Sequence, residues 1–229
     1  MLPIIAIGNL TISTYYLFMA LGFVAMVYLM VRRRAIFSLT VLEAILLSCL
    51  IMISGLVGCK ALFILENLRY VREHGITLGG FSFFGAVFFV PAAMSLLGKL
   101  FRLRPGQSLD ACAPCVCAMV GTIRVGCFLN GCCGGWALPN GFCFPTQAIE
   151  SIGNFVILFW LLDLEERGKQ KLYPRFMLAY GILRFAVEFL RDTPKNWLGL
   201  SHGQWFAIVS STVATIAMAS GKKRGMGNV

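Results

Sequence analysis

Seven long apolar runs constrain the fold of this chain more than any other feature. A helix needs about 20 predominantly apolar residues to cross the ~30 Å hydrocarbon core of a bilayer. The chain is 58% hydrophobic and 13% charged, whereas about a quarter of the residues in a soluble domain are charged. We therefore expect an all-α integral membrane protein, a single domain over residues 1–229, with seven transmembrane helices at 12–31, 39–65, 79–98, 110–130, 147–162, 176–190 and 203–220.

Basic residues are unevenly divided between the two sides of these helices, and this asymmetry predicts the orientation. One side holds four, which are Arg69, Arg72, Arg191 and Lys195. The other side holds thirteen, which are Arg32, Arg33, Arg34, Lys99, Arg102, Arg104, Arg167, Lys169, Lys171, Arg175, Lys222, Lys223 and Arg224. We expect the N-terminus outside and the C-terminus in the cytoplasm. Topology and attraction to anionic lipid headgroups account for the net charge of +10, so nucleic-acid binding is not expected.

Three basic and two acidic residues within the apolar runs are the candidates for function: Lys60, Arg124, Glu150, Arg184 and Glu188. Each charge in hydrocarbon costs at least ~2.5 kcal/mol, which makes such residues candidates for function. At a rise of ~1.5 Å per residue, Arg124 and Glu150 lie about 20 Å above the cytoplasmic boundary, and Arg184 lies near the midplane. Lys60 and Tyr15 lie near outer helix ends. We expect these groups to meet in the outer half of the bilayer.

Helical spacing groups the polar residues into two stripes. One stripe is Tyr180, Arg184, Glu188 and Arg191, and the other is Gln147, Glu150 and Asn154. The planar guanidinium makes paired hydrogen bonds to phosphate and stays protonated in a low dielectric. A site for a lipid phosphate is therefore favoured. The alternative is that Arg184–Glu188 and Arg124–Glu150 are internal ion pairs that only fix helix packing.

Three segments resemble the signature of a known family. They are GTIRVGCFLNGCCGG at 121–135, FPTQAIE at 144–150, and YGILRFAVEFLR at 180–191 followed by Gly203-Gln204. They are similar to segments of the bacterial prolipoprotein diacylglyceryl transferases. Segments 15–22, 58–67 and 80–85 follow the family's order and spacing, so the resemblance covers nearly the whole chain.

The resemblance implies a multi-pass enzyme of the bacterial cytoplasmic (inner) membrane with no cofactor. Such enzymes move the diacylglyceryl group of phosphatidylglycerol to the thiol of a lipobox cysteine in a preprotein, forming a thioether and releasing glycerol phosphate. Arg124 and Arg184 would hold the lipid phosphate, with Glu150 as a base or headgroup acceptor. Glu188 would orient Arg184, and Asn130 and Tyr15 would contact the headgroup. The remaining substrate-binding candidates are Gln147, Tyr180, Lys60 and Arg191.

Three departures from the family pattern leave the general base and the acceptor open. Phe84 stands where family members have histidine, and Cys132 stands where many have a carboxylate. The loop between Gly135 and Phe144 is short, whereas typical members insert an extracytoplasmic head region there. We therefore expect the acceptor to be a lipobox-bearing preprotein or another thiol acceptor, and a member that is inactive on lipoproteins stays an open alternative.

Four cysteines are expected at the outer face: Cys127, Cys132, Cys133 and Cys143. Disulfides among them would suit an oxidising compartment, but their pairing cannot be read from sequence. Zinc ligation is a weaker reading because no histidine is nearby, and no metal site is predicted. Two rival functions remain open at this point. One is a cysteine-based membrane thiol/disulfide redox protein working with a quinone, and the other is a non-catalytic protein that binds or transports anionic lipid.

Overall fold

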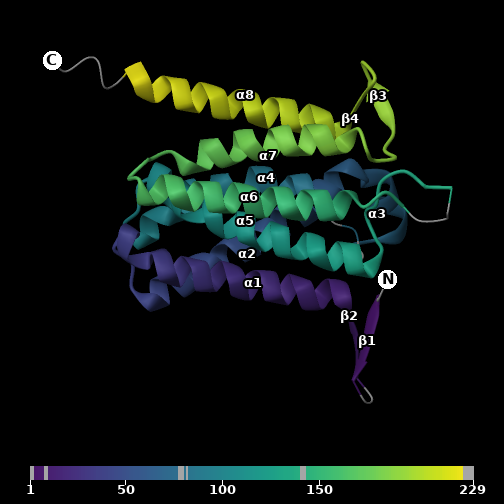
Figure 1. Ribbon diagram of the computed structural model, residues 1–229, viewed down its shortest axis with the longest axis horizontal. Helices are drawn as coiled ribbons and strands as arrows, with labels where there is room; N and C mark the ends of the chain where they lie inside the picture. Colours follow the sequence, from purple (N-terminus) through teal and green to yellow (C-terminus); the bar gives the residue numbers. More distant parts are fainter. Residues whose placement is uncertain (1–2, 8–9, 77–79, 81, 140–142, 224–229) are drawn as a thin grey trace. The chain divides into compact units, whose positions relative to one another are not determined.

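The computed structural model describes residues 3–7, 10–76, 80, 82–139 and 143–223, and these residues are mostly helical (Figure 1). Short 3-10 turns follow two of the helices at Arg34–Phe37 and Gly98–Phe101. The α-helices of the described residues are α1 (Thr14–Arg33), α2 (Val41–Glu66), α3 (Leu68–His74), α4 (Phe83–Leu97), α5 (Pro105–Asn130), α6 (Thr146–Glu166), α7 (Leu172–Glu188) and α8 (His202–Lys223).

Each of the seven predicted apolar runs overlaps one of these helices, with boundaries shifted by a few residues. Four helical segments are long and apolar enough to cross a bilayer: Thr14–Phe37, Val41–Glu66, Pro105–Asn130 and Thr146–Glu166. A fifth, Gly85–Phe101, is apolar but shorter. The expectation of a helical membrane protein is therefore confirmed, and the count of seven spans stays a prediction.

The chain divides into two compact units. The first comprises Met1–Met26 and Ala113–Val229. Within it, α7 packs against both α6 and α8 (Figure 1). Two glycines allow these helices to approach closely. A Cβ at Gly153 of α6 would overlap Leu183 of α7, and one at Gly181 of α7 would overlap Ser211 of α8. Small residues let helix backbones approach closely in apolar surroundings.

The second unit comprises Val27–Cys112, and its core is the pair α2 and α4. The first turn of α2 is fixed by a capping box in which the Thr40 hydroxyl accepts from the backbone N–H of Glu43. The Glu43 carboxylate accepts in return from the Thr40 N–H at 2.8 Å. Such reciprocal bonds satisfy amides that a helix start leaves without partners. Gly58 of α2 and Gly85 of α4 lie at the crossing of the two helices.

Replacing Gly85 with alanine is expected to destabilise the protein by about 1–3 kcal/mol, the usual cost of overpacking. The added Cβ would overlap the backbone of Gly58, which cannot rotate away as a side chain can. Thermal unfolding in detergent would measure the change. Gly106→Ala is the matched control, since a Cβ there would meet nothing within 4 Å. Equal unfolding temperatures for the two variants would contradict this packing.

Two small antiparallel hairpins were not predicted. Strand β1 (Ile4–Ile7) pairs with β2 (Leu10–Ser13), with Ile4 opposite Ser13. This hairpin delays the start of α1 from the predicted residue 12 to Thr14. Strand β3 (Lys195–Trp197) pairs with β4 (Leu200–Ser201) between α7 and α8. The second hairpin matters for the site, because Ser201 belongs to it.

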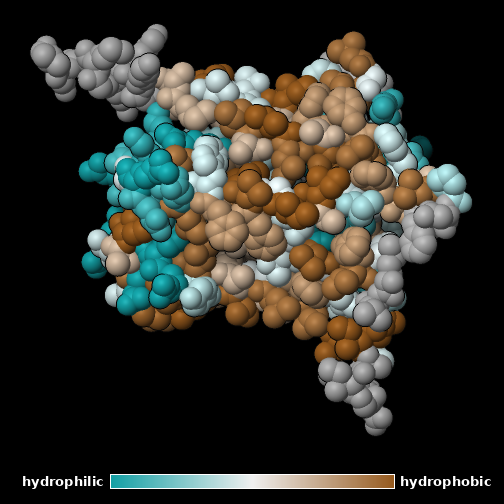
Figure 2. Space-filling view, in the orientation of Figure 1, coloured by the Kyte–Doolittle hydropathy of each residue, from teal (hydrophilic) through white to brown (hydrophobic). Residues whose placement is uncertain are grey.

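The surface of the first unit has the pattern expected of a protein in a bilayer. Figure 2 shows hydrophobic side chains over the middle of the helices, and hydrophilic ones gathered where α6 ends and α7 begins. Exposed hydrophobic residues on α6 include Ile152, Val156 and Phe159. The basic residues of the connection between α6 and α7 lie at the hydrophilic end. Lipid contact explains an exposed apolar surface that water would penalise.

Candidate functional site

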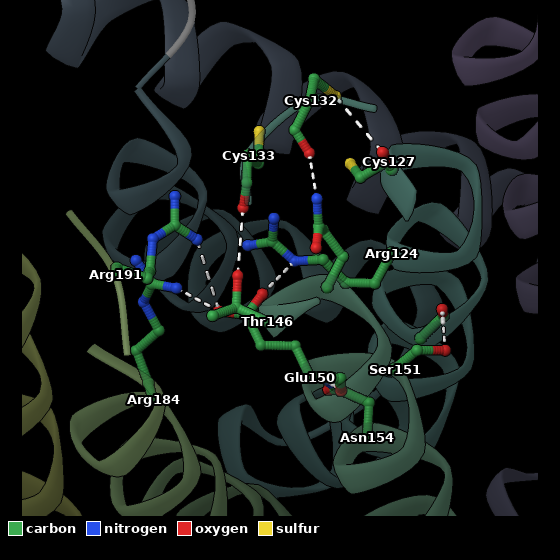
Figure 3. Close-up of polar contacts among 12 residues, drawn as sticks. Arg124, Cys127, Cys132, Cys133, Thr146, Glu150, Ser151, Asn154, Arg184 and Arg191 are labelled. Carbon is green, nitrogen blue, oxygen red and sulfur yellow. Dashed lines mark hydrogen bonds and ion pairs between the residues drawn. The ribbon is translucent and has the colours of Figure 1, made fainter. Parts of the chain in front are cut away.

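A buried carboxylate, Glu150, joins two arginines from neighbouring helices at the centre of the site (Figure 3). Glu150 lies in α6, and its side chain is 1% exposed. Its Oε2 forms an ion pair with Nε of Arg124 from α5. Its Oε1 forms an ion pair with Nη1 of Arg184 from α7. One carboxylate therefore links three helices of the first unit.

A second carboxylate and a third arginine extend this cluster. Nη2 of Arg184 lies 2.8 Å from Oε2 of Glu188, one helical turn further along α7. Arg191 lies just beyond the end of α7, with Nη1 3.7 Å from Oε1 of Glu150 and Nε 3.9 Å from Oε2 of Glu188. Three guanidinium groups against two carboxylates leave one positive charge uncompensated. The internal ion pairs predicted from the sequence do form, and they belong to one network.

Glu188 is held in place by two hydroxyl groups from the segment that follows α7, one before the second hairpin and one in its second strand. Its Oε1 accepts hydrogen bonds from Thr193 Oγ1 at 3.0 Å and from Ser201 Oγ at 2.9 Å. Ser201 is itself fixed at the start of α8, where its N–H donates to Gln204 Oε1 and its hydroxyl accepts from the Gln204 N–H. Gly203 lies directly against the carboxylate. These contacts fix the orientation of Glu188 and hence of Arg184.

Gly203→Ala is expected to lower the activity of this site about tenfold, because a shift of about 1 Å in a positioned group can cost up to about 100-fold. The new Cβ would lie 2.9 Å from Cδ of Glu188, too close for the carboxylate to stay where it is. The loss should appear in kcat, measured from initial rates. Gly106→Ala serves again as control, and full activity of Gly203→Ala would show that Glu188 does not position Arg184.

The start of α6 ties the site to the loop after α5. Thr146 Oγ1 donates to the carbonyl of Cys133 at 3.2 Å, and Gln147 Nε2 donates to the carbonyl of Cys132 at 2.6 Å. The N–H of Gly135 donates to the carbonyl of Phe144 at 2.8 Å. Hydrogen bonds therefore pin this loop, and all nine cysteines are free thiols in this structure. The disulfides considered from the sequence are not present in it.

Hydrogen bonds between α5 and α6 fix the position of Glu150 relative to α5. Ser151 Oγ donates to the carbonyl of Gly121 at 2.8 Å, and the Cys117 thiol donates to the carbonyl of Asn154 at 2.9 Å. Asn154 Nδ2 donates in turn to the carbonyl of Glu150 at 2.7 Å. These buried hydrogen bonds favour a single arrangement of the two helices, because breaking any of them would leave a buried polar group without a partner, which is costly.

Some buried polar atoms of the site have no hydrogen-bond partner among the described residues. Among them are three atoms at the edge of the ion-pair network: Nε of Arg184, Nε2 of Gln204 and Oε1 of Gln147. An unsatisfied buried group costs about 1–3 kcal/mol, so a native structure needs a reason to keep it. Two of the three are donors, and they lie beside a surplus positive charge. An anionic group with several acceptor oxygens would satisfy them.

The other predicted site residues lie at different distances from this cluster. Tyr180 is buried on α7, one turn before Arg184, and interacts with Arg124. Tyr15, in the first turn of α1, is close enough to Arg124 to interact with its charge. Asn130 ends α5 and accepts from Ser13 Oγ at 3.5 Å.

Lys60 belongs to the second unit, where its Nζ donates to the carbonyl of Gly80 at 3.4 Å and lies over the Phe63 ring. The side chain of Phe84 lies outside the described part of the structure. The structure therefore places neither Lys60 nor the Phe84 side chain at the cluster.

Sequence reasoning missed the hydroxyl groups that support the acidic residues: Thr146, Ser151, Thr193 and Ser201. A hydroxyl residue carries little information by itself, since it is common in loops and at helix starts. The spacing of Ser201 and Gln204, a capping-box pattern, was the one available signal. It would have placed a helix start beside the Gly203-Gln204 segment.

Three of the free cysteines form a cluster at the end of α5. The Sγ atoms of Cys127, Cys132 and Cys133 all lie within 4.8 Å of one another. A hydrogen bond with Cys127 lowers the pKa of the Cys133 thiol below its usual range, and the positive charge of Arg124 lowers it further. The cluster is therefore chemically distinct from the buried cysteines of the helices.

Apolar helices enclosing a network of arginines and glutamates define a multi-pass membrane protein with a polar site inside its helical part. The family model described as prolipoprotein diacylglyceryl transferase matches residues 3–220. The chain belongs to the prolipoprotein diacylglyceryl transferase family, as the sequence motifs predicted, and is a transferase.

Several relatives carry the name phosphatidylglycerol–prolipoprotein diacylglyceryl transferase. The chain is 28% identical to one from Clostridium tetani, over 87% of this chain and 89% of the relative. It is 29% identical to one from Dehalococcoides mccartyi, over 91% of this chain and 89% of the relative. It is 33% identical to one from Cupriavidus necator, over 65% of this chain and 62% of the relative. The similarity to the first two extends over most of both chains.

Proposed function

We propose that this protein transfers the diacylglyceryl group of phosphatidylglycerol to a cysteine thiol of a prolipoprotein or a related acceptor. The product is a thioether, and glycerol phosphate is released. The observation that carries the proposal is the network of Arg124, Arg184 and Arg191 around Glu150, with one uncompensated positive charge. The names of the relatives support the same substrates.

The surplus positive charge of the site complements the negative charge of phosphatidylglycerol. Phosphatidylglycerol carries one negative charge on its phosphodiester, which would neutralise the surplus positive charge of the cluster. Each guanidinium offers five N–H donors, and the ion pairs to Glu150 and Glu188 use only part of them. Phosphate oxygens can accept from the remaining donors in the paired geometry that arginine favours. A zwitterionic lipid brings an additional positive headgroup charge, which this site would repel.

The arginines also suit the chemical step. The acceptor thiolate attacks the glycerol carbon that carries the phosphate, the new C–S bond forms, and the C–O bond to the phosphate breaks. The leaving phosphate gains negative charge as that bond breaks. Fixed cations in a site with little water stabilise such developing charge without having to reorganise. Arg124 and Arg184 are assigned this role, because their side chains are only 12% and 9% exposed.

The two carboxylates are assigned positioning roles. Protonating Glu150 would disrupt its ion pairs with the arginines, so it is poorly suited to take a proton from the acceptor thiol. Its contacts suit it to hold Arg124 and Arg184 at a fixed spacing. Glu188 orients Arg184 in the same way, supported by Thr193 and Ser201. Tyr180, Gln147 and the donors Arg184 Nε and Gln204 Nε2 would surround the lipid phosphate.

Other contacts of the substrate are proposed from the family resemblance. Tyr15 and Asn130 would contact the glycerol headgroup, and Lys60 would add a second positive charge near the outer boundary. The acceptor is a lipobox-bearing preprotein or another protein thiol.

We also propose seven membrane spans over a single domain, with the N-terminus outside, in the bacterial cytoplasmic (inner) membrane. The distribution of basic residues supports this orientation. In the first unit, α5 ends, α6 begins and α7 ends beside the site, whereas the basic connection between α6 and α7 lies at the other end of these helices. The site would therefore face the outer leaflet, where secreted preproteins emerge.

The direct test incubates the purified protein with labelled phosphatidylglycerol and a lipobox peptide. The proposal predicts a diacylglyceryl thioether on the peptide cysteine and one glycerol phosphate for each thioether, both detected by mass spectrometry. Lipid binding without product would favour the lipid-binding or transport reading. Thiol oxidation without lipid consumption would favour the redox reading, and either result would overturn the proposal.

A further inference from the structure

The three-cysteine cluster lies at the end of α5, the helix that carries Arg124 of the arginine network. Cys127 is buried, Cys132 is half-buried and Cys133 is exposed, so the cluster runs from the interior to the surface. Figure 3 shows these cysteines on the same side of the site, next to Arg124. Arg124 and Arg191 are both close enough to Cys133 to interact with its charge. A ligand bound to the three sulfurs would therefore sit beside the proposed phosphate site.

The local backbone brings the three thiols together. After α5 ends, Gly131 and Cys133 both take positive φ angles, 77° and 63°, which fold the chain back over the last helical turn. The Cys132 N–H then donates to the carbonyl of Cys127 at 3.2 Å. A non-glycine residue such as Cys133 costs about 1–3 kcal/mol in this conformation, and it persists only where the surroundings hold it. The bonds from Thr146 and Gln147 to the carbonyls of this turn supply that restraint.

The donor set points to one kind of metal ion. Within the described residues, the group contains three cysteines and no histidine or carboxylate. Thiolate ligands select soft or borderline ions such as zinc over magnesium or calcium. Zn–S bonds of about 2.3 Å in a tetrahedron place sulfurs about 3.8 Å apart, which agrees with a group confined within 4.8 Å. Three ligands also leave the fourth tetrahedral position open, as catalytic zinc sites do.

We propose that Cys127, Cys132 and Cys133 bind a zinc ion whose open position takes the thiol of the acceptor cysteine. The inference rests on the proposed function, because it assigns the step that makes the acceptor nucleophilic. It departs from the sequence-based expectation that the chain has no metal site. It also gives the chain a way to activate the acceptor thiol, although Phe84 stands where the family has histidine.

The bonds and charges of this step balance. A thiol that coordinates zinc loses its proton to solvent, since the metal binds the thiolate form. The thiolate sulfur attacks the glycerol carbon of phosphatidylglycerol, and the carbon–oxygen bond breaks with its electron pair going to the phosphate. The thioether product is uncharged and binds zinc weakly, so it leaves the open position. No oxidant or reductant is needed.

The first experiment titrates cobalt(II), a coloured substitute for zinc, into reduced, metal-free protein in detergent without oxygen. We expect one cobalt per chain and a thiolate-to-cobalt charge-transfer absorption that zinc removes by displacement. Cys127→Ser and Cys133→Ser should each weaken binding at least 100-fold. The matched controls Cys143→Ser, from the same outer region, and Cys49→Ser, from α2, should change it less than twofold. Absence of the absorption, or equal binding by the triple variant of the cluster, would overturn the proposal.

The second experiment tests the open position. Adding a lipobox peptide to the cobalt-loaded protein should change the cobalt spectrum, and a peptide with serine in place of its cysteine should not. No change, or loss of cobalt binding in Cys143→Ser, would show a closed structural site and would overturn the proposal.

Transfer assays with zinc-loaded and metal-free protein then separate this inference from the proposed function. We expect the metal-free protein to transfer at least tenfold more slowly. An equal rate would overturn the zinc step while leaving the lipid transfer intact. If the zinc-loaded protein binds the peptide thiol but never consumes phosphatidylglycerol, the metal site stands and the proposed function fails.

Discussion

Replacing Glu150 with glutamine is expected to reduce transfer at least 100-fold and to destabilise the protein by about 3–5 kcal/mol, the usual cost of removing one partner from a buried ion pair. Glutamine has nearly the same shape but carries no charge, so Arg124, Arg184 and Arg191 would repel one another. They would no longer share the acceptor that fixes their spacing. Initial rates with labelled phosphatidylglycerol, together with thermal unfolding, would measure both effects.

Glu166→Gln is the matched control, because Glu166 is an exposed acidic residue at the end of the same helix. It should leave rate and stability unchanged within error. Rates for Glu150→Gln must be taken at a temperature at which the variant remains folded. A folded Glu150→Gln protein with full activity would show that the arginine network needs no central carboxylate.

The substitutions Arg124→Lys and Arg184→Lys are each expected to lower kcat by about 100- to 1,000-fold, the loss seen when one preorganised donor to a developing anion is removed. Lysine keeps the positive charge but cannot present two parallel N–H groups to a phosphate or to Glu150. The effect should fall mainly on kcat, since charge that develops on the leaving phosphate is present only in the transition state.

Arg167→Lys supplies the control for these variants. Arg167 pairs with Asp163 at 2.9 Å on the surface, and its side chain is 68% exposed. Exposed ion pairs contribute little to stability, so this variant should behave as the unmodified protein does. If either site variant raised only KM and left kcat unchanged, its arginine would bind the lipid without stabilising the leaving group.

The membrane helices could be predicted because their signal is strong and local. A run such as 39–65 contains few polar residues, and hydrocarbon excludes any structure that leaves backbone groups unpaired. Spacing alone also placed Arg184 and Glu188 on one helical face, where they do form an ion pair. The segments 147–162, 176–190 and 203–220 were less distinct in sequence, and each is helical over most of its length.

The hairpins could not be predicted from the same signal. The segment Ile4–Ile7 is short and apolar, so hydropathy cannot distinguish a strand there from the approach to a helix. The third arginine shows a related limit. Arg191 continues the helical stripe by counting, but α7 ends at Glu188, and Arg191 reaches Glu150 from the following turn.

The supporting groups depend on tertiary contacts that no local pattern records. Ser201 contacts Glu188 only because the second hairpin folds back over the end of α7. The three-cysteine cluster depends on the positive φ angles of Gly131 and Cys133. The sequence placed these cysteines at the outer face, and the turn decides which of them meet.

The central claim is that the buried arginines bind an anionic phospholipid. Native mass spectrometry of the purified protein, with equal amounts of phosphatidylglycerol and phosphatidylcholine of the same acyl chains, tests it most directly. We predict that bound phosphatidylglycerol exceeds phosphatidylcholine at least tenfold, and that Arg184→Gln removes this preference while Arg167→Gln keeps it. Equal binding of the two lipids, or an unchanged preference in Arg184→Gln, would contradict the account.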